Sequence, residues 1–146
     1  MKKIFAIMIL LAGVMTFTSC GDDLDDASSD EQLIVGKWEL DEEVVDQYDI
    51  GRVVHVTSTL EFKKNGKYSF EGRKQTYFYG KKIYDDTEKD EGKYSVDEYN
   101  EQVAFKSSKD YTYGGEYKSI SKSKLYIRID RFEIFDEFDY AVYSRK

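Results

Sequence analysis

A strict alternation of apolar and polar residues near the middle of the chain most constrains its fold. The first set is Val54, Val56, Ser58, Leu60 and Phe62, and the second is His55, Thr57, Thr59, Glu61 and Lys63. Because successive residues of a strand point to opposite faces, this pattern predicts a half-buried β-strand. Asn65-Gly66 follows it and favours a two-residue hairpin turn with positive φ angles. Residues 67–70 are therefore predicted to return as the next strand.

Further strands are predicted along the rest of the chain, separated by glycine, serine, lysine and acidic turns. Their ranges are 37–45, 75–84, 92–96, 103–106, 111–119, 125–130 and 138–144. A short helix is predicted at 29–35, where a serine at 28 or 29 can cap its first turn. Sequential antiparallel strands without crossover helices predict an all-β fold, an antiparallel up-and-down barrel of about eight strands. Charged residues on the outward faces favour a barrel that stands in water.

The N-terminal segment has the features of an export signal. Two lysines precede an apolar run over residues 4–14, which has the length of a signal-peptide core and falls short of the roughly 20 residues that span a bilayer. Residues 17–19, "FTS", with Cys20 resemble the lipobox of bacterial lipoproteins. That resemblance implies removal of residues 1–19 and acylation of Cys20 with fatty chains such as palmitate. The alternative is an ordinary signal peptide with an incidental cysteine.

Residues 20–30 are rich in aspartate, serine and glycine, a composition that cannot bury enough apolar surface to fold alone. We therefore expect an acidic tether between the lipidated cysteine and a single domain over residues 31–146. The acidic cluster also resembles the surface-export signal of Bacteroidota-type lipoproteins, which would display the domain on the outer face. A solvated linker is the alternative.

Charge and the scarcity of histidine exclude several function classes. The chain has 29 acidic and 22 basic residues, a net charge of -7, which argues against nucleic acid or anionic lipid as a partner. The single histidine, His55, lies on the outward face of its predicted strand without a recognisable serine or aspartate motif, so no catalysis is expected. Residues 85–92 do not fit the spacing of a calcium loop, and neither a metal nor another cofactor is expected.

The first predicted strand carries a family resemblance. Gly36-Lys37-Trp38 resembles the G-x-W signature of lipocalins, and residues 33–146 are similar to the small lipocalin-like lipoproteins of Bacteroidota. The resemblance implies a close turn at Gly36, a barrel end closed by Trp38, and a basic residue of the last strand stacked across the indole ring. Arg145 is the expected residue, with Arg128 and Arg131 as alternatives. Short strands would leave the barrel cavity shallow or filled.

Tyrosines are abundant, and some are expected on the surface. The chain has 13 tyrosines and nine phenylalanines. If Phe78 points inward, Tyr77 and Tyr79 point outward, while Tyr111 and Tyr113 lie next to a glycine turn. Tyrosine suits binding surfaces because it combines a rigid apolar face with a hydroxyl group. Cross-strand pairing that stabilises the sheet is the alternative.

Together these features predict a non-enzymatic lipoprotein, anchored by lipid in the bacterial outer membrane. Its barrel is expected to bind a small apolar or amphipathic ligand at its open end. The alternative is an interaction module in which the exposed tyrosines bind an envelope protein or a glycan and the barrel is an inert scaffold.

Overall fold

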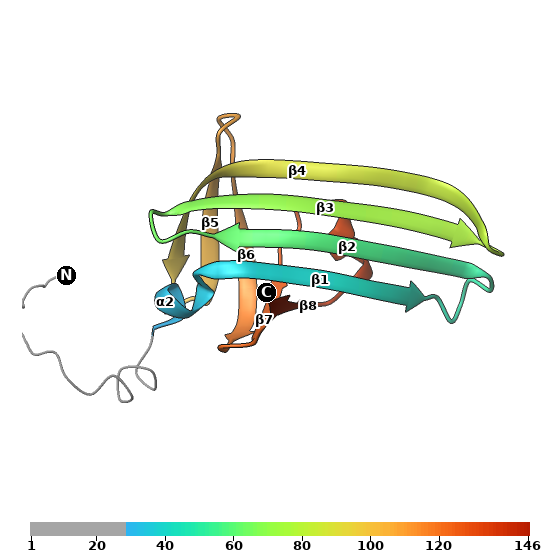
Figure 1. The fold of residues 1–146 in the computed structure, drawn as a ribbon, viewed down its shortest axis with the longest axis horizontal. Helices are drawn as coiled ribbons and strands as arrows, with labels where there is room; N and C mark the ends of the chain where they lie inside the picture. The colour runs from blue at the N-terminus through green and yellow to red at the C-terminus, as the bar shows by residue number, and fades with distance from the viewer. Residues whose placement is uncertain (1–28) are drawn as a thin grey trace, which may run out of the picture.

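The computed structural model describes residues 29–146, in which eight antiparallel strands close into a single barrel (Figure 1). The elements are α2 (Asp30–Ile34), β1 (Gly36–Val45), β2 (Arg52–Phe62), β3 (Lys67–Phe78), β4 (Lys81–Asp97), β5 (Gln102–Ser107), β6 (Thr112–Ile120), β7 (Lys124–Arg128), the 3-10 helix η2 (Glu133–Glu137) and β8 (Ala141–Arg145). Each strand pairs with its neighbours in the sequence, and β8 returns to β1. The predicted all-β up-and-down barrel with a short N-terminal helix is confirmed.

The expectations for the leader, Cys20 and residues 20–28 of the tether lie outside the described residues. Within the described part of the chain, no helix is long and apolar enough to cross a bilayer.

Strands β1 to β4 are longer than the barrel that they help to close. Strand β1 pairs with β8 only through Trp38–Arg145 and Glu39–Ser144, whereas it pairs with β2 from Gly36 to Val45. Strand β4 pairs with β5 only over residues 92–97. Beyond these points, residues 40–45, 52–58, 72–78 and 81–90 form an open four-stranded sheet, which we call the extension (Figure 1).

Apolar side chains fill the interior of the barrel. Leu60, Phe62, Phe105, Leu125 and Tyr143 are among the core residues with at most 2% of their surface exposed. At one end, α2 and Trp38 close the core. At the other end, the η2 segment contributes three buried residues: Phe132, Ile134 and Phe135. Aromatic pairs link the strands to this segment, as between Phe70 of β3 and Phe132, whose ring centroids are 3.9 Å apart.

The strand predicted at residues 75–84 is wrong. Strand β3 continues unbroken to Phe78, the chain turns at Tyr79 and Gly80, and β4 then runs from Lys81 to Asp97. Residues 71–75 and 85–91 are mostly polar because the outer face of the extension is solvated and β4 is exposed on both faces from Lys81 to Thr87. A polar segment of this kind resembles a turn in the sequence. The long hairpin ladder satisfies the backbone groups regardless of side-chain polarity.

Helix α2 is also shorter than predicted, with Ser29 as its cap: the Gln32 amide donates to the Ser29 hydroxyl.

The hairpin between β2 and β3 is present, but its predicted two-residue turn is wrong. The Lys63 amide donates to the Lys67 carbonyl over 2.8 Å, and the Gly66 amide donates to the Lys63 carbonyl over 3.1 Å. The loop therefore contains residues 64–66. Within it only Gly66 has a positive φ, 81°, as in three-residue hairpins that end on a left-handed glycine.

Gly66→Ala is predicted to lower the free energy of unfolding by about 1 kcal/mol, because the left-handed conformation is costly for a residue with a Cβ. A Cβ at this position would meet nothing within 4 Å, so the cost comes from the backbone alone. Gly114→Ala is the matched control: its φ is ordinary and its nearest neighbour would be 3.8 Å away, so stability should stay equal or rise. Urea unfolding of the two variants compares them, and equal losses would contradict the assignment.

Candidate functional site

The α2 end of the barrel is closed by Trp38 and Arg145, which face each other across the β1–β8 pairing. Trp38 is fully buried, and its indole Nε1 donates a hydrogen bond of 2.8 Å to the Ile34 carbonyl at the end of α2. The guanidinium carbon of Arg145 lies 4.2 Å from the centroid of the Trp38 ring. This places a cation over an aromatic face. The alternatives for this place, Arg128 and Arg131, lie elsewhere: Arg128 binds Asp130 and Arg131 lies over the Tyr111 ring.

Arg145 also binds backbone carbonyls from two other parts of the chain. Its guanidinium donates to the carbonyls of Leu33, Val35 and Lys122. The first two are left without helical partners at the end of α2, so Arg145 caps that helix while it covers Trp38. Gly36 has a φ of 143°, and a Cβ there would collide with the Arg145 guanidinium. The close approach therefore requires glycine.

Arg145→Ala is predicted to lower the free energy of unfolding by about 3 kcal/mol, through loss of the cation–ring contact and of charge-assisted hydrogen bonds. Arg145→Lys should recover only part of that loss, because a compact ammonium group lacks the planar fork that binds the Leu33, Val35 and Lys122 carbonyls while it covers the ring. Arg128→Ala, at an exposed ion pair, serves as the control and should change stability little. Full recovery by lysine in chemical denaturation would contradict the role assigned to the planar guanidinium.

A buried carboxylate lies inside the barrel wall at Asp90, which is 5% exposed. One carboxylate oxygen accepts hydrogen bonds from the Tyr68 and Tyr113 hydroxyls, at 2.7 and 2.6 Å, and the other accepts from the Ser107 hydroxyl at 2.6 Å. Burial raises the pKa of the Asp90 carboxyl, but these hydrogen bonds together outweigh it and hold that pKa below its ordinary value. Burial also raises the pKa of both tyrosines well above the usual 10. The cluster is a satisfied polar network that joins β3, β4, β5 and β6.

Asp90→Asn is predicted to cost about 1–3 kcal/mol of stability at neutral pH, because an amide offers one acceptor oxygen where three hydroxyls donate. The folded-state pKa of Asp90 lies below its ordinary 3.8, so the carboxylate contributes stability above about pH 4 and loses that contribution as the pH falls through the folded value. The difference between wild type and variant should therefore shrink in acid. Urea unfolding across this pH range tests it, and a constant difference would contradict the assignment.

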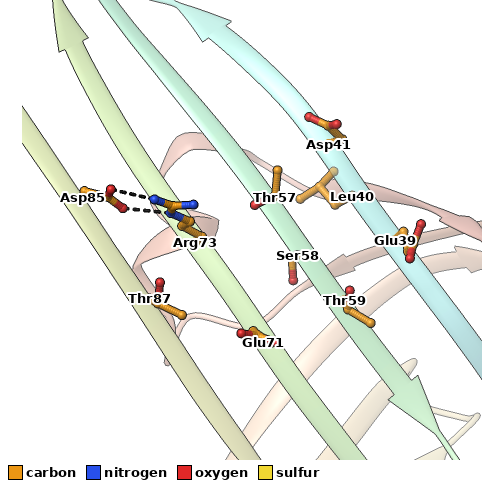
Figure 2. Close-up of a pocket in the computed structure, with 10 residues that line it drawn as sticks. All are labelled: Glu39, Leu40, Asp41, Thr57, Ser58, Thr59, Glu71, Arg73, Asp85 and Thr87. Atoms are coloured by element: carbon orange, nitrogen blue, oxygen red, sulfur yellow. Dashed lines mark hydrogen bonds and ion pairs between the residues drawn. The ribbon is translucent and has the colours of Figure 1, made fainter. Parts of the chain in front are cut away.

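A polar groove runs across the outer face of β1 to β4 (Figure 2). It has a volume of about 690 Å³, with Thr57, Thr59 and Thr87 among its lining and carboxylates on both sides. Asp85 accepts two hydrogen bonds from the Arg73 guanidinium, at 2.9 and 2.8 Å, and one from the Lys82 ammonium. These cations hold the pKa of Asp85 well below its usual range. Arg73, the one basic residue among those that line the groove, is thus already paired with Asp85.

His55 lies on the outward face of β2, as expected, and its Nε2 is 2.8 Å from an Asp41 carboxylate oxygen. Among residues 29–146, no group of three or more histidine, cysteine, aspartate or glutamate side chains is arranged to hold a metal ion.

The β1–β2 and β3–β4 hairpins end on the side of the molecule away from α2 (Figure 1). Exposed apolar side chains lie at and near these hairpin ends. We call these residues the distal tip: Val45, Tyr48, Ile50, Phe78, Tyr79 and Ile83, with exposed fractions of 67%, 89%, 75%, 39%, 69% and 61%. The two hairpin ends are joined, since the Tyr79 amide donates to the Gly51 carbonyl over 2.8 Å. The Tyr79 ring lies against Gly51 and meets the Phe78 ring edge-on, with centroids 4.7 Å apart.

The tyrosines proposed from the sequence as a surface are separated in the structure. Tyr79 belongs to the distal tip, and Tyr77 points outward next to it but is half-buried. Tyr111 packs under the Arg131 guanidinium. Tyr113 differs from expectation: it points inward, because the odd positions of β6 face the core, and its hydroxyl binds Asp90.

Sequence reasoning missed the other members of the distal tip. Tyr48 and Ile50 stand in the loop "DQYDIG", between charged neighbours, where apolar residues have no core to enter. Apolar residues in a polar hairpin loop were the signal from which an exposed apolar surface could have been predicted. Ile83 was hidden within the wrongly placed strand at 75–84.

No family model matches the chain, and no curated protein matches it. Among solved structures, it is similar to a crystal structure described as a "putative lipoprotein" from Shewanella oneidensis, with 12% sequence identity and a TM-score of 0.42. The match covers 81% of this chain and 97% of the other. At that TM-score the likeness carries no argument about family or function.

Proposed function

We propose that this chain is a lipid-anchored lipoprotein of the bacterial envelope that acts as an interaction module. In this proposal Cys20 carries the acyl chains, the residues between Cys20 and the α2 cap Ser29 form the tether, and the barrel is a scaffold that presents the distal tip to a protein partner. The observation that carries it is the contrast between a filled barrel interior and six exposed apolar side chains at the end of the extension.

The barrel interior gives little support to a ligand at its centre. Trp38 with Arg145 and the η2 segment occupy the two ends, and core side chains such as Phe62, Phe105 and Tyr143 occupy the space between them. A small apolar ligand would have to displace side chains that already pack closely. Native mass spectrometry of gently extracted protein is the direct check for a retained ligand.

The composition of the distal tip favours a protein over a glycan. Ile50, Ile83 and Val45 are aliphatic, and they offer neither hydrogen bonds nor flat rings to a sugar. Protein interfaces are built around aromatic and aliphatic anchors with a polar rim. Here Asp46 and Arg52, 3.5 Å apart, supply part of such a rim. Exposed apolar clusters of this kind mark interaction sites in proteins that are otherwise soluble.

A photocrosslinking amino acid at position 48, in cells that express the full chain, is predicted to give a discrete protein adduct. The same group at Tyr99, which is 94% exposed but lies in the β4–β5 turn, is the matched control and should not give that adduct. Ile50→Ser combined with Ile83→Ser should abolish the adduct, because it removes the aliphatic anchors, whereas Tyr126→Ser on the barrel wall should keep it.

Two results would count against the proposal. Identical adducts from positions 48 and 99 would show that the distal tip has no specific partner. If a Cys20→Ser chain stays in the membrane fraction as the wild type does, the lipid anchor is wrong, whatever the distal tip binds.

A further inference from the structure

Three lysines stand directly opposite one another on the outer face of the barrel. Lys67 on β3 pairs with Lys93 on β4, and Lys93 pairs with Lys106 on β5. We call these residues the lysine ladder. All three side chains are exposed, and within residues 29–146 none of them has a carboxylate within ion-pairing distance. Like charges at directly opposed positions of a sheet are destabilising, so the arrangement works against folding.

The lysine ladder borders a hollow of about 490 Å³. Lys63 adds a fourth ammonium group to its lining, and Glu91 and Asp110 are the carboxylates there, so the lining has an excess of two positive charges. Gly92 forms part of the wall, at a place where a Cβ would collide with the Lys106 carbonyl. Local charge thus opposes the net charge of -7 that the chain carries as a whole.

The lysine ladder lies at the α2 end of the long strands. Lys67 follows the β2–β3 turn, and that turn is next to the start of β1, where Gly36 pairs with Phe62 (Figure 1). The same end carries Ser29, from which the chain leads back to Cys20. A domain held by lipid at Cys20 is therefore connected to its anchoring point at this end, while the distal tip is at the opposite end of the extension.

We infer that the lysine ladder is a docking surface for the phosphate head groups of the bilayer to which the chain is anchored. Ammonium groups in a row suit phosphate anions as point charges, and basic residues near an anionic bilayer each add to binding. Contact through the lysine ladder orients the barrel and directs the distal tip away from the membrane. The inference rests on the proposed function only through the lipid anchor at Cys20. The following experiment uses protein without that anchor, so it tests the lysine ladder by itself.

The experiment measures co-sedimentation of the mature chain, residues 20–146 with Cys20→Ser, with vesicles of phosphatidylcholine alone or mixed with phosphatidylglycerol. Binding is expected to the mixed vesicles only, and to weaken as salt is raised. Changing all three ladder lysines to glutamine should weaken binding on the order of 100-fold. The matched control changes Lys81, Lys89 and Lys118 to glutamine, which alters the net charge equally and should preserve binding.

Stability provides a second readout that vesicle binding does not affect. Lys93→Gln removes the lysine that is opposed on both sides, so the melting temperature of the free protein should rise by about 1–3 °C. The same change at Lys81, an exposed lysine at the far end of β4, should leave it unaltered. A rise at position 93 together with weaker vesicle binding is the combination expected of a surface that costs stability for the sake of binding.

Four outcomes would overturn the inference. The first is equal binding to neutral and mixed vesicles, and the second is unchanged binding by the ladder variant. The third is protection from unfolding by inorganic phosphate without any vesicle binding, a result that would indicate a site for free anions. The fourth is vesicle binding that appears only after the tether aspartates are changed to asparagine, since the tether would then be the occupant. Because the protein tested carries no lipid, failure here leaves the anchor and the distal tip to be judged by their own experiments.

Discussion

The structure depends on the closure between the first strand and the last, and Arg145 is at the centre of it. Two residue pairs and one further backbone hydrogen bond, from the Lys146 amide to the Lys37 carbonyl, join this end of the described chain to β1, so the seam is short. The Arg145 guanidinium strengthens the seam by covering Trp38 and by binding carbonyls at the end of α2. One side chain thus joins the helix, both terminal strands and the core. Without that seam, the sheet would have two further open edges.

How far the fold was predictable depended on which face of each strand is buried. The alternation over residues 54–62 predicted β2 because one face of that strand enters the core along its whole length. The extension was divided wrongly because its polarity does not distinguish a solvated ladder from a turn. Asp90 could not be identified from the sequence, since a core carboxylate is recognisable only with the hydroxyl groups that β3, β5 and β6 bring to it. The partnership of Trp38 with Arg145 was expected only through the lipocalin resemblance.

The two ends of the molecule differ in physical character. Apolar side chains end the extension, whereas the lysine ladder lies toward α2 at the other end. The extension separates them, and in it the four strands β1 to β4 are paired in register with their neighbours. Such a body can hold two surfaces at a fixed separation, which a flexible chain of equal length cannot do.

The open margins of the extension have a consequence for how copies of this protein coexist. Residues 40–45 of β1 and 81–90 of β4 present backbone donors and acceptors that no neighbouring strand of the barrel takes up. The chain has no proline to interrupt such a margin. Asp41, Glu42 and Glu43 place three negative charges in a row along β1, and this repulsion keeps another copy from adding its own strand there. At high local concentration, copies of this chain would be kept from pairing with one another along the β1 margin by its carboxylates.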